Sequence, residues 1–217
     1  MLIVDIGNTN FHIYNGTSIV HLSHKKAIKK YKNKKLLYIS VNKKINKKIK
    51  GIKKWRNISD KIRLNGEYST MGVDRKALCL SKKNGIFIDA GSAITIDIMR
   101  DGIYQGGFIL LGLRQYLKAY KDISAVLDIQ LNKDLSLNKL PKTTKDAISY
   151  GIISSIKAVI SLHQKENRIY FSGGDGKFLS RFFKKSVYDE ELLFKGIIKS
   201  LRIKNRDKYD NNSTSKR

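Results

Sequence analysis

The chain has 217 residues, 41% of them hydrophobic, and a formal net charge of +26. This length and hydrophobic fraction are typical of a globular protein with a substantial core, either one compact unit or two small lobes. The single cysteine, Cys79, excludes an intrachain disulfide framework, and the four histidines lack metal-site spacing. No signal peptide precedes the first apolar run and no run is long enough to cross a bilayer, so we expect a cytoplasmic protein without membrane contact.

Much of the positive charge lies between Lys25 and Arg63, where lysine dominates and arginine is scarce. Aromatic residues are not interleaved with these lysines, as a surface that stacks nucleic-acid bases would require. We therefore favour a solvated basic surface over a dedicated nucleic-acid site. Such charge still predicts weak, salt-dependent contact with nucleic acid of any sequence.

Hydrophobic periodicity and turn residues predict an alternation of strands and helices. Residues 45, 49 and 52 are isoleucines at helical spacing among lysines, which indicates an amphipathic helix with a basic face. The polar residues 204–217 are typical of a disordered tail. In chain order we expect strands at 2–4 and 11–14, a helix at 25–31, a strand at 36–41, helices at 45–55 and 72–80, a hairpin at 86–98, a strand at 103–110, helices at 113–121 and 144–164, a strand at 168–171, and helices at 177–185 and 190–201.

The first hairpin has a polar tip, Asp5-Ile6-Gly7-Asn8-Thr9. Glycine allows a bulky anion to approach the backbone, amides and hydroxyls can donate to phosphate oxygens, and Asp5 is a candidate metal ligand. The same residues also favour an ordinary turn, so this tip alone does not establish a phosphate site.

The pattern recurs in IFIDAGSAITIDI, residues 86–98, about 84 residues further along the chain. Asp89, Gly91 and Ser92 repeat the polar tip, and alternation places Thr95 and Asp97 on the strand that follows. A repeated hairpin suggests two related lobes that hold one polyphosphate, although two generic hairpins would also look alike. A third glycine-rich segment, residues 173–176, would allow a base or ribose to approach the backbone closely. An ordinary strand-to-helix turn would use the same residues.

The commonest nucleotide-binding patterns do not fit. The sequence contains no G-x-x-x-x-G-K-[ST], and the first glycine turn leads into a strand instead of the helix of a dinucleotide site.

Four motifs, in order, resemble those of the type III pantothenate kinases, within the superfamily of acetate and sugar kinases, Hsp70 and actin. They are Asp5–Thr9, Gly72-Val73-Asp74-Arg75 as G-x-D-R, Asp89–Asp97 as D-x-G-T-A-x-T-x-D, and Gly106–Gly112 as G-G-x-I-x-P-G. The resemblance implies an α/β fold of two ribonuclease-H-like, actin-like ATPase lobes with mixed sheets flanked by helices and ATP between them. We place the lobes at residues 1–84 and 85–203.

The resemblance also implies an activity, which is ATP-dependent phosphorylation of pantothenate at the start of coenzyme A synthesis. Asp74 would be the general base, a role that suits a carboxylate, and Arg75 would bind the pantothenate carboxylate through its planar fork. Without the resemblance, Asp74 would merely favour a helix N-terminus and Arg75 would lie on the surface. Thr144 would contact pantothenate, although a helix cap would equally select threonine.

The remaining implied roles concern ATP, cations and assembly. Asp89 would bind a monovalent cation, K⁺ or NH₄⁺, Asp5 is the candidate ligand for Mg²⁺ with ATP, and the protein would be a homodimer. The full set expected to bind ATP is Asp5, Ile6, Gly7, Asn8, Thr9, Asn10, Phe11, His12 and Ser92, and the set for pantothenate is Gly72, Val73, Asp74, Arg75 and Thr144.

Two residues depart from the family pattern: Ser92 replaces threonine and keeps the hydroxyl, whereas Leu111 replaces proline and frees φ in the loop. Two other functions remain open. The first is a catalytically weak, kinase-like paralogue that regulates through nucleic-acid binding, which the retained carboxylates disfavour. The second is an actin-like or Hsp70-like ATPase, for whose added subdomains 217 residues leave little room.

Overall fold

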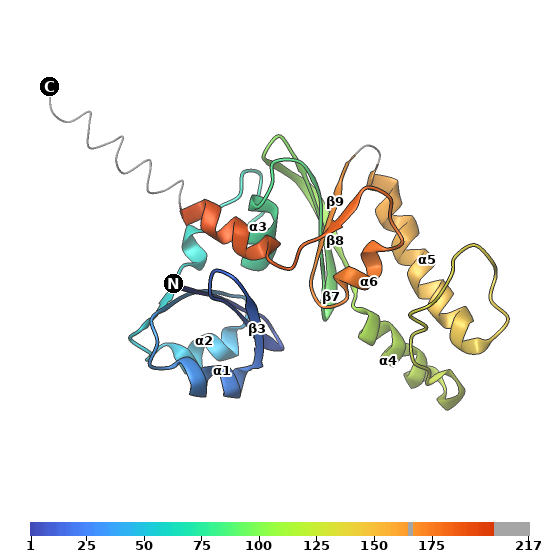
Figure 1. The fold of residues 1–217 in the computed structure, drawn as a ribbon, viewed down its shortest axis with the longest axis horizontal. Helices are drawn as coiled ribbons and strands as arrows, with labels where there is room; N and C mark the ends of the chain where they lie inside the picture. Colours follow the sequence, from blue (N-terminus) through green and yellow to red (C-terminus); the bar gives the residue numbers. More distant parts are fainter. Residues whose placement is uncertain (165–166, 202–217) are drawn as a thin grey trace, which may run out of the picture. The chain divides into compact units, whose positions relative to one another are not determined.

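The computed structural model describes residues 1–164 and 167–201 (Figure 1). Packing divides the chain into two compact units, each with one five-stranded sheet. Among the described residues, unit 1 comprises 1–83, 102–104 and 191–201, and unit 2 comprises 84–101, 105–164 and 167–190. This division differs from the predicted lobes at residues 84, 102–104 and 191–201, while the predicted tail at 204–217 lies outside the described residues.

The sheet of unit 1 has the strand order β3-β2-β1-β4-β5. The first three strands form an antiparallel meander, and β4 and β5 are parallel to β1. In chain order, this unit contains β1 (Leu2–Ile6), β2 (Asn10–Tyr14), β3 (Ile19–Ser23), α1 (His24–Tyr31), β4 (Leu36–Ser40), α2 (Lys43–Ile49), β5 (Trp55–Asn57), the 3-10 turn η1 (Ser59–Lys61), α3 (Val73–Leu80) and a helix at residues 192–201.

The second sheet repeats the topology of the first, with the order β10-β9-β6-β7-β8. Its first strand, β6, is antiparallel to β7 and parallel to β9, as β1 is to β2 and β4. The prediction of two related ribonuclease-H-like lobes is therefore confirmed. The elements are β6 (Gly85–Ala90), β7 (Ala93–Arg100), β8 (Ile103–Leu111), α4 (Leu113–Ile123), the 3-10 turn η2 (Ala125–Leu127), α5 (Thr144–Gln164), β9 (Ile169–Ser172), α6 (Gly176–Ser180) and β10 (Ser186–Tyr188).

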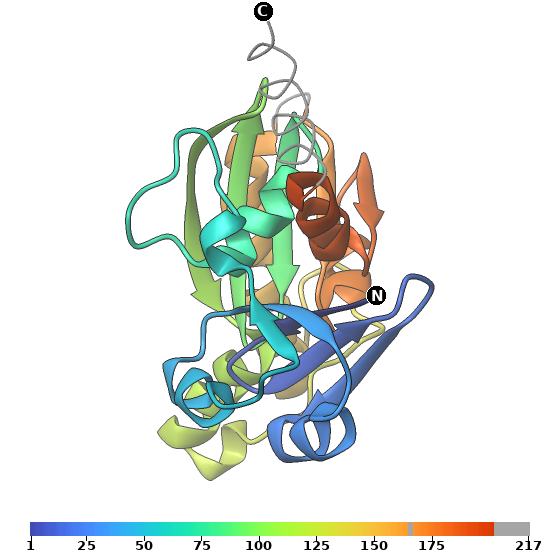
Figure 2. The same ribbon diagram turned by 90° about the vertical axis from the view of Figure 1, so that its left-hand side faces the viewer.

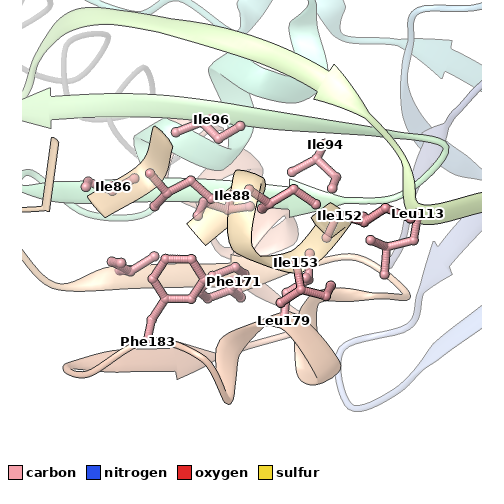
Figure 3. Close-up of a cluster of buried hydrophobic side chains, with 14 of the residues drawn as sticks. Ile86, Ile88, Ile94, Ile96, Leu113, Ile152, Ile153, Phe171, Leu179 and Phe183 are labelled. Carbon is pink, nitrogen blue, oxygen red and sulfur yellow. The ribbon is translucent and has the colours of Figure 1, made fainter. Parts of the chain in front are cut away.

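Each sheet has one strongly apolar face. In unit 1, Val4, Ile6 and Phe11 pack with buried residues of α1 and α2, so these two helices cover that face of the sheet (Figure 2). The lysines of both helices are exposed. In unit 2, the stripe of isoleucines on α5 packs against Ile86, Ile88, Ile94, Ile96 and Phe171 (Figure 3). Because side chains alternate along a strand, Asp5 and His12 of the first sheet and Asp89 of the second point to the opposite face.

Several predicted elements have different limits. The helix expected at 45–55 ends at Ile49, and Trp55 begins β5, where its indole donates to the Tyr31 carbonyl at 3.1 Å. The helix expected at 177–185 is only α6, followed by the short strand β10. Strand β3 was not predicted. No helix within the described ranges has both the length and the apolarity needed to span a membrane.

Candidate active site

The tip of the first hairpin is accessible while its flanks are buried. Asn8 and Thr9 are exposed, and the Gly7 amide donates to the Asn10 carbonyl at 3.0 Å, which closes the turn. A Cβ on Gly7 would meet no atom of the protein closer than 3.5 Å. Internal packing therefore does not require glycine at this position, and the missing side chain allows a ligand to approach the backbone.

The other residues of this segment have mixed environments. Ile6 and Phe11 belong to the apolar core, so only their backbone could contact ATP. The Asp5 side chain is almost buried, and His12 is half-buried with its Nδ1 2.6 Å from Nδ1 of His21.

The structure brings the first hairpin and the G-x-D-R turn to the same edge of the first sheet. Strands β1 and β4 are parallel and in register, so both end at this edge. Val41, directly after β4, donates its amide to the Ile6 carbonyl at 3.4 Å. A Cβ on Gly72 would lie 3.8 Å from the Val41 side chain. Two segments that are more than 60 residues apart in sequence thus become neighbours through β4.

Asp74 lies in the first turn of α3, which begins at Val73 after the N-cap Gly72. Its Oδ1 accepts the Arg75 amide at 2.8 Å. A Cβ on Gly72 would lie 2.5 Å from the same oxygen, so a larger residue at this position would displace the carboxylate from its observed position. Negative charge at a helix N-terminus is favourable, and this turn holds the carboxylate in a defined position.

Arg75 is buried, with 6% of its surface exposed. Its Nη1 donates to the Tyr68 hydroxyl at 2.6 Å and its Nη2 to the Tyr104 hydroxyl at 3.3 Å. The guanidinium carbon also lies 5.9 Å from the centre of the Tyr68 ring. The alternative that Arg75 is an ordinary surface residue is therefore wrong. Neither tyrosine could be identified as a site residue from the sequence, because a tyrosine side chain is polar only at its hydroxyl group.

An ion pair fixes the loop that carries Tyr68. Lys76 Nζ lies 2.9 Å from Glu67 Oε1, and both side chains are largely buried. The second Glu67 oxygen accepts the Leu64 amide at 2.8 Å, and Arg63 adds a contact at 3.3 Å. Burial would raise the pKa of Glu67, but the hydrogen bonds from Lys76, Leu64 and Arg63 outweigh it and lower that pKa.

In unit 2, Asp89 lies at the centre of a polar row that crosses three strands. Thr95 of β7 is its antiparallel partner and Ser172 of β9 its parallel partner. The Thr95 Oγ1 is buried and makes no hydrogen bond. A half-buried carboxylate and a neighbouring hydroxyl oxygen that lacks a partner fit a hard cation, which prefers oxygen ligands. Asp97 lies further along β7 and is fully buried.

Two glycines are required around this second tip. Gly112, the N-cap of α4, would place a Cβ 2.6 Å from the Ser92 carbonyl oxygen. Gly173 has φ +83° and would place a Cβ 2.6 Å from the Ala90 carbonyl oxygen. Backbone atoms cannot move aside at low energetic cost, so packing requires glycine at both positions. They bring the loops after β8 and β9 onto the Gly91 tip, where Ser92 remains exposed.

Thr144 is exposed in the first turn of α5, a helix that covers the apolar face of the second sheet. Asp89 lies on the opposite face, so unit 2 does not bring these two residues together. Thr144 is also not the helix cap: Oγ1 of Thr143 accepts the Asp146 amide at 3.2 Å. Thr143 therefore caps the N-terminus of α5, and Thr144 is not needed for this role.

No group of three histidine, cysteine or carboxylate side chains within residues 1–164 and 167–201 is arranged to hold a metal ion.

The sequence profile of type III pantothenate kinases matches residues 55–164. A type III pantothenate kinase of Helicobacter hepaticus is 42% identical over 202 residues, which cover 93% of this chain and 98% of that protein. The corresponding protein of Campylobacter hominis is 41% identical over 206 residues, covering 94% and 99%.

Among solved structures, a Campylobacter jejuni protein described as a Baf family transcriptional activator superposes with a TM-score of 0.86 at 35% identity, covering 95% of this chain and all of the other. A 2-dehydro-3-deoxygalactonokinase-like protein of Sinorhizobium meliloti has a TM-score of 0.53 at 10% identity, covering 93% and 98%, and supports the fold alone.

Proposed function

Because the chain belongs to the type III pantothenate kinase family, a family of phosphotransferases, we propose that it transfers the γ-phosphoryl group of ATP to the primary hydroxyl of pantothenate. The product would be 4'-phosphopantothenate, the first intermediate of coenzyme A biosynthesis, made in the cytoplasm. The observation that carries this proposal is the G-x-D-R turn, which holds a carboxylate and a buried, tyrosine-bound arginine beside the first hairpin tip.

Asp74 is the proposed general base. Its carboxylate would accept the hydroxyl proton of pantothenate as the phosphoryl group transfers, which removes positive charge from the attacking oxygen. In a loose transition state most of the rate comes from position and charge neutralisation, so the fixed orientation of this carboxylate matters as much as its basicity.

Arg75 is the proposed partner of the pantothenate carboxylate. Two tyrosine hydroxyls hold its guanidinium in place before substrate binds, which reduces the entropy lost on binding. Tyr68 and Tyr104 are thus proposed positioning residues.

ATP would be bound through the two hairpin tips. The amides and polar side chains of Gly7, Asn8 and Thr9 can donate to phosphate oxygens, as can the exposed Ser92 hydroxyl. Asp5 would hold Mg²⁺, and Asp89 with the unpaired Thr95 hydroxyl would hold K⁺ or NH₄⁺. Such cations supply positive charge against the phosphates.

We further propose a homodimer. Thr144 is exposed on a helix that covers the face of the sheet opposite Asp89, and in this assembly it would contact the pantothenate of a second subunit. Sedimentation at assay concentration tests this assembly, and a monomer that retains full activity would contradict it.

A regulator that binds nucleic acid remains a second candidate, because the C. jejuni structure is described as a transcriptional activator and α1 and α2 expose many lysines. Competition binding across salt concentrations with unrelated duplexes tests it. We expect binding that is indifferent to sequence and is lost as salt rises. Preference for one sequence at physiological salt would favour the regulator.

The decisive experiment measures ADP release, with and without pantothenate, in Mg²⁺ and either K⁺, NH₄⁺ or Na⁺. We expect pantothenate-dependent turnover that K⁺ and NH₄⁺ support and Na⁺ supports poorly. ATP binding without pantothenate-dependent turnover would overturn the proposed activity, whereas equal turnover in all three salts would remove only the monovalent cation.

A further inference from the structure

Two histidines face each other across neighbouring strands of the first sheet. His12 of β2 and His21 of β3 are paired in register, and their Nδ1 atoms lie 2.6 Å apart. Their ring planes are inclined at 75°. Since both nitrogens converge on one proton, their lone pairs point to a common position between the rings.

Asp5 extends this pair into a row across three strands. It is the register partner of His12 on β1, so all three side chains leave the same face of the sheet. This face lies opposite the apolar core made with α1 and α2. The row therefore combines two nitrogen ligands with a neighbouring carboxylate, a combination that attracts a cation.

We propose that the His12–His21 pair binds a late first-row divalent metal ion of the Zn²⁺ or Cu²⁺ class. Imidazole nitrogen is a preferred ligand for these ions, whereas Mg²⁺ prefers oxygen. The metal replaces the shared proton and takes one Nδ1 from each ring.

The geometry requires only a small adjustment. Zinc–nitrogen bonds of about 2.0–2.1 Å in a tetrahedral site place the two nitrogens about 3.3 Å apart. The rings must separate by roughly 0.7 Å, which an exposed His21 on the edge strand β3 permits. Because the described residues supply no third histidine, cysteine or carboxylate ligand, water completes the coordination and binding is reversible.

A metal ion bound by His12 and His21 would lie close to the first hairpin tip and change its electrostatic environment. His12 is two residues beyond Asn10, whose carbonyl closes the tip, and its strand partner is Asp5. A divalent ion on His12 places positive charge beside the carboxylate proposed to hold Mg²⁺, so it should weaken Mg²⁺–ATP binding and inhibit turnover. This consequence, unlike metal binding itself, rests on the proposed kinase function.

The test is calorimetric titration of the full chain with Zn²⁺ after treatment with a chelator, together with NMR of the histidine ring nitrogens. We expect saturable binding, with Nδ1 of His12 and His21 as the perturbed nitrogens. His21→Asn should weaken binding by more than the roughly 10- to 100-fold typical of losing an outer-shell partner, because a direct ligand is removed. His163→Asn, on an exposed part of α5, is the matched control and should leave binding unchanged.

Circular dichroism establishes that each variant is folded. Equal Zn²⁺ affinity in wild type and His21→Asn, or perturbation confined to other histidines, would overturn the site. Zn²⁺ binding with unaltered turnover at saturation would overturn the inhibitory consequence. Zn²⁺ binding in a protein without kinase activity would support the site and contradict only the proposed function.

Discussion

The substitution Glu67→Gln tests whether the ion pair behind Tyr68 holds the G-x-D-R turn. Lys76 Nζ lies 2.9 Å from Glu67 Oε1, with the two side chains 10% and 18% exposed. Glutamine keeps the size of the side chain and an oxygen that can accept the Leu64 amide, but it removes the negative charge opposite Lys76.

The expected loss of stability follows from the burial of this ion pair. Removing one partner of a fully buried ion pair costs about 3–5 kcal/mol, and an exposed pair contributes about 0–1 kcal/mol. Glu67 retains some exposure and glutamine preserves one hydrogen bond, so we expect the free energy of unfolding to fall by about 2–3 kcal/mol. The KM for pantothenate should rise as well, because the loop that carries Tyr68 loses its anchor.

Equilibrium urea unfolding at pH 7 measures the stability change. Arg63→Gln is the matched control, since its side chain is 68% exposed, and it should cost less than about 1 kcal/mol. Adding Lys76→Met to Glu67→Gln should restore most of the stability, because the buried unpaired charge is then removed. A Glu67→Gln variant as stable as Arg63→Gln would refute the reasoning.

The same pair predicts a pH dependence. The pKa of Glu67 is lower in the folded protein than in the unfolded chain, where it is about 4.3. The ionised Glu67 side chain therefore contributes its full stabilisation above the unfolded-state pKa, and this stabilisation is lost as pH falls through the folded-state pKa. The difference in stability between wild type and Glu67→Gln should be constant near neutral pH and shrink below about pH 4.

Three further substitutions test the site. Asp74→Asn should lower kcat by roughly two to four orders of magnitude with ATP binding retained in calorimetry, and near-normal turnover would exclude this base. Arg75→Lys should raise the KM for pantothenate about tenfold or more, since an ammonium cannot reproduce the fork between two tyrosine hydroxyls, and an unchanged KM would contradict the proposed carboxylate contact. Gly173→Ala should lower the free energy of unfolding in urea by about 1–3 kcal/mol, because the added Cβ would clash with the Ala90 carbonyl. A variant as stable as the wild type would show that the loop can move to relieve this clash.

Much of the fold could be predicted from local patterns. The two hairpins, α3 and α5 have strong periodicity and clear turn residues, and the repeated Asp-x-Gly tip correctly predicted two related lobes. The errors arose where the pattern was ambiguous. Ile52 continues the helical spacing of Ile45 and Ile49, but the chain turns after Ile49 so that Trp55 can join the sheet beside β4.

The surroundings of Arg75 could not be predicted in the same way. Tyr68 lies in a loop and Tyr104 on a distant strand, and neither has a spacing that relates it to Arg75. Only the fold brings them together. The buried ion pair of Glu67 and Lys76 could not be predicted either, because charged residues are usually exposed and only the structure shows that these two are buried.

The helix at residues 192–201 has a consequence for synthesis of the protein. It belongs to unit 1, where the Phe194 ring stacks on Tyr14 at 5.1 Å and Gly196 packs against the Ala77 carbonyl of α3. Unit 2 lies almost entirely between these segments in the chain. During translation the second lobe can therefore fold before the first is complete, and the helix that carries Asp74 packs against Gly196 only after the C-terminal helix has been synthesised.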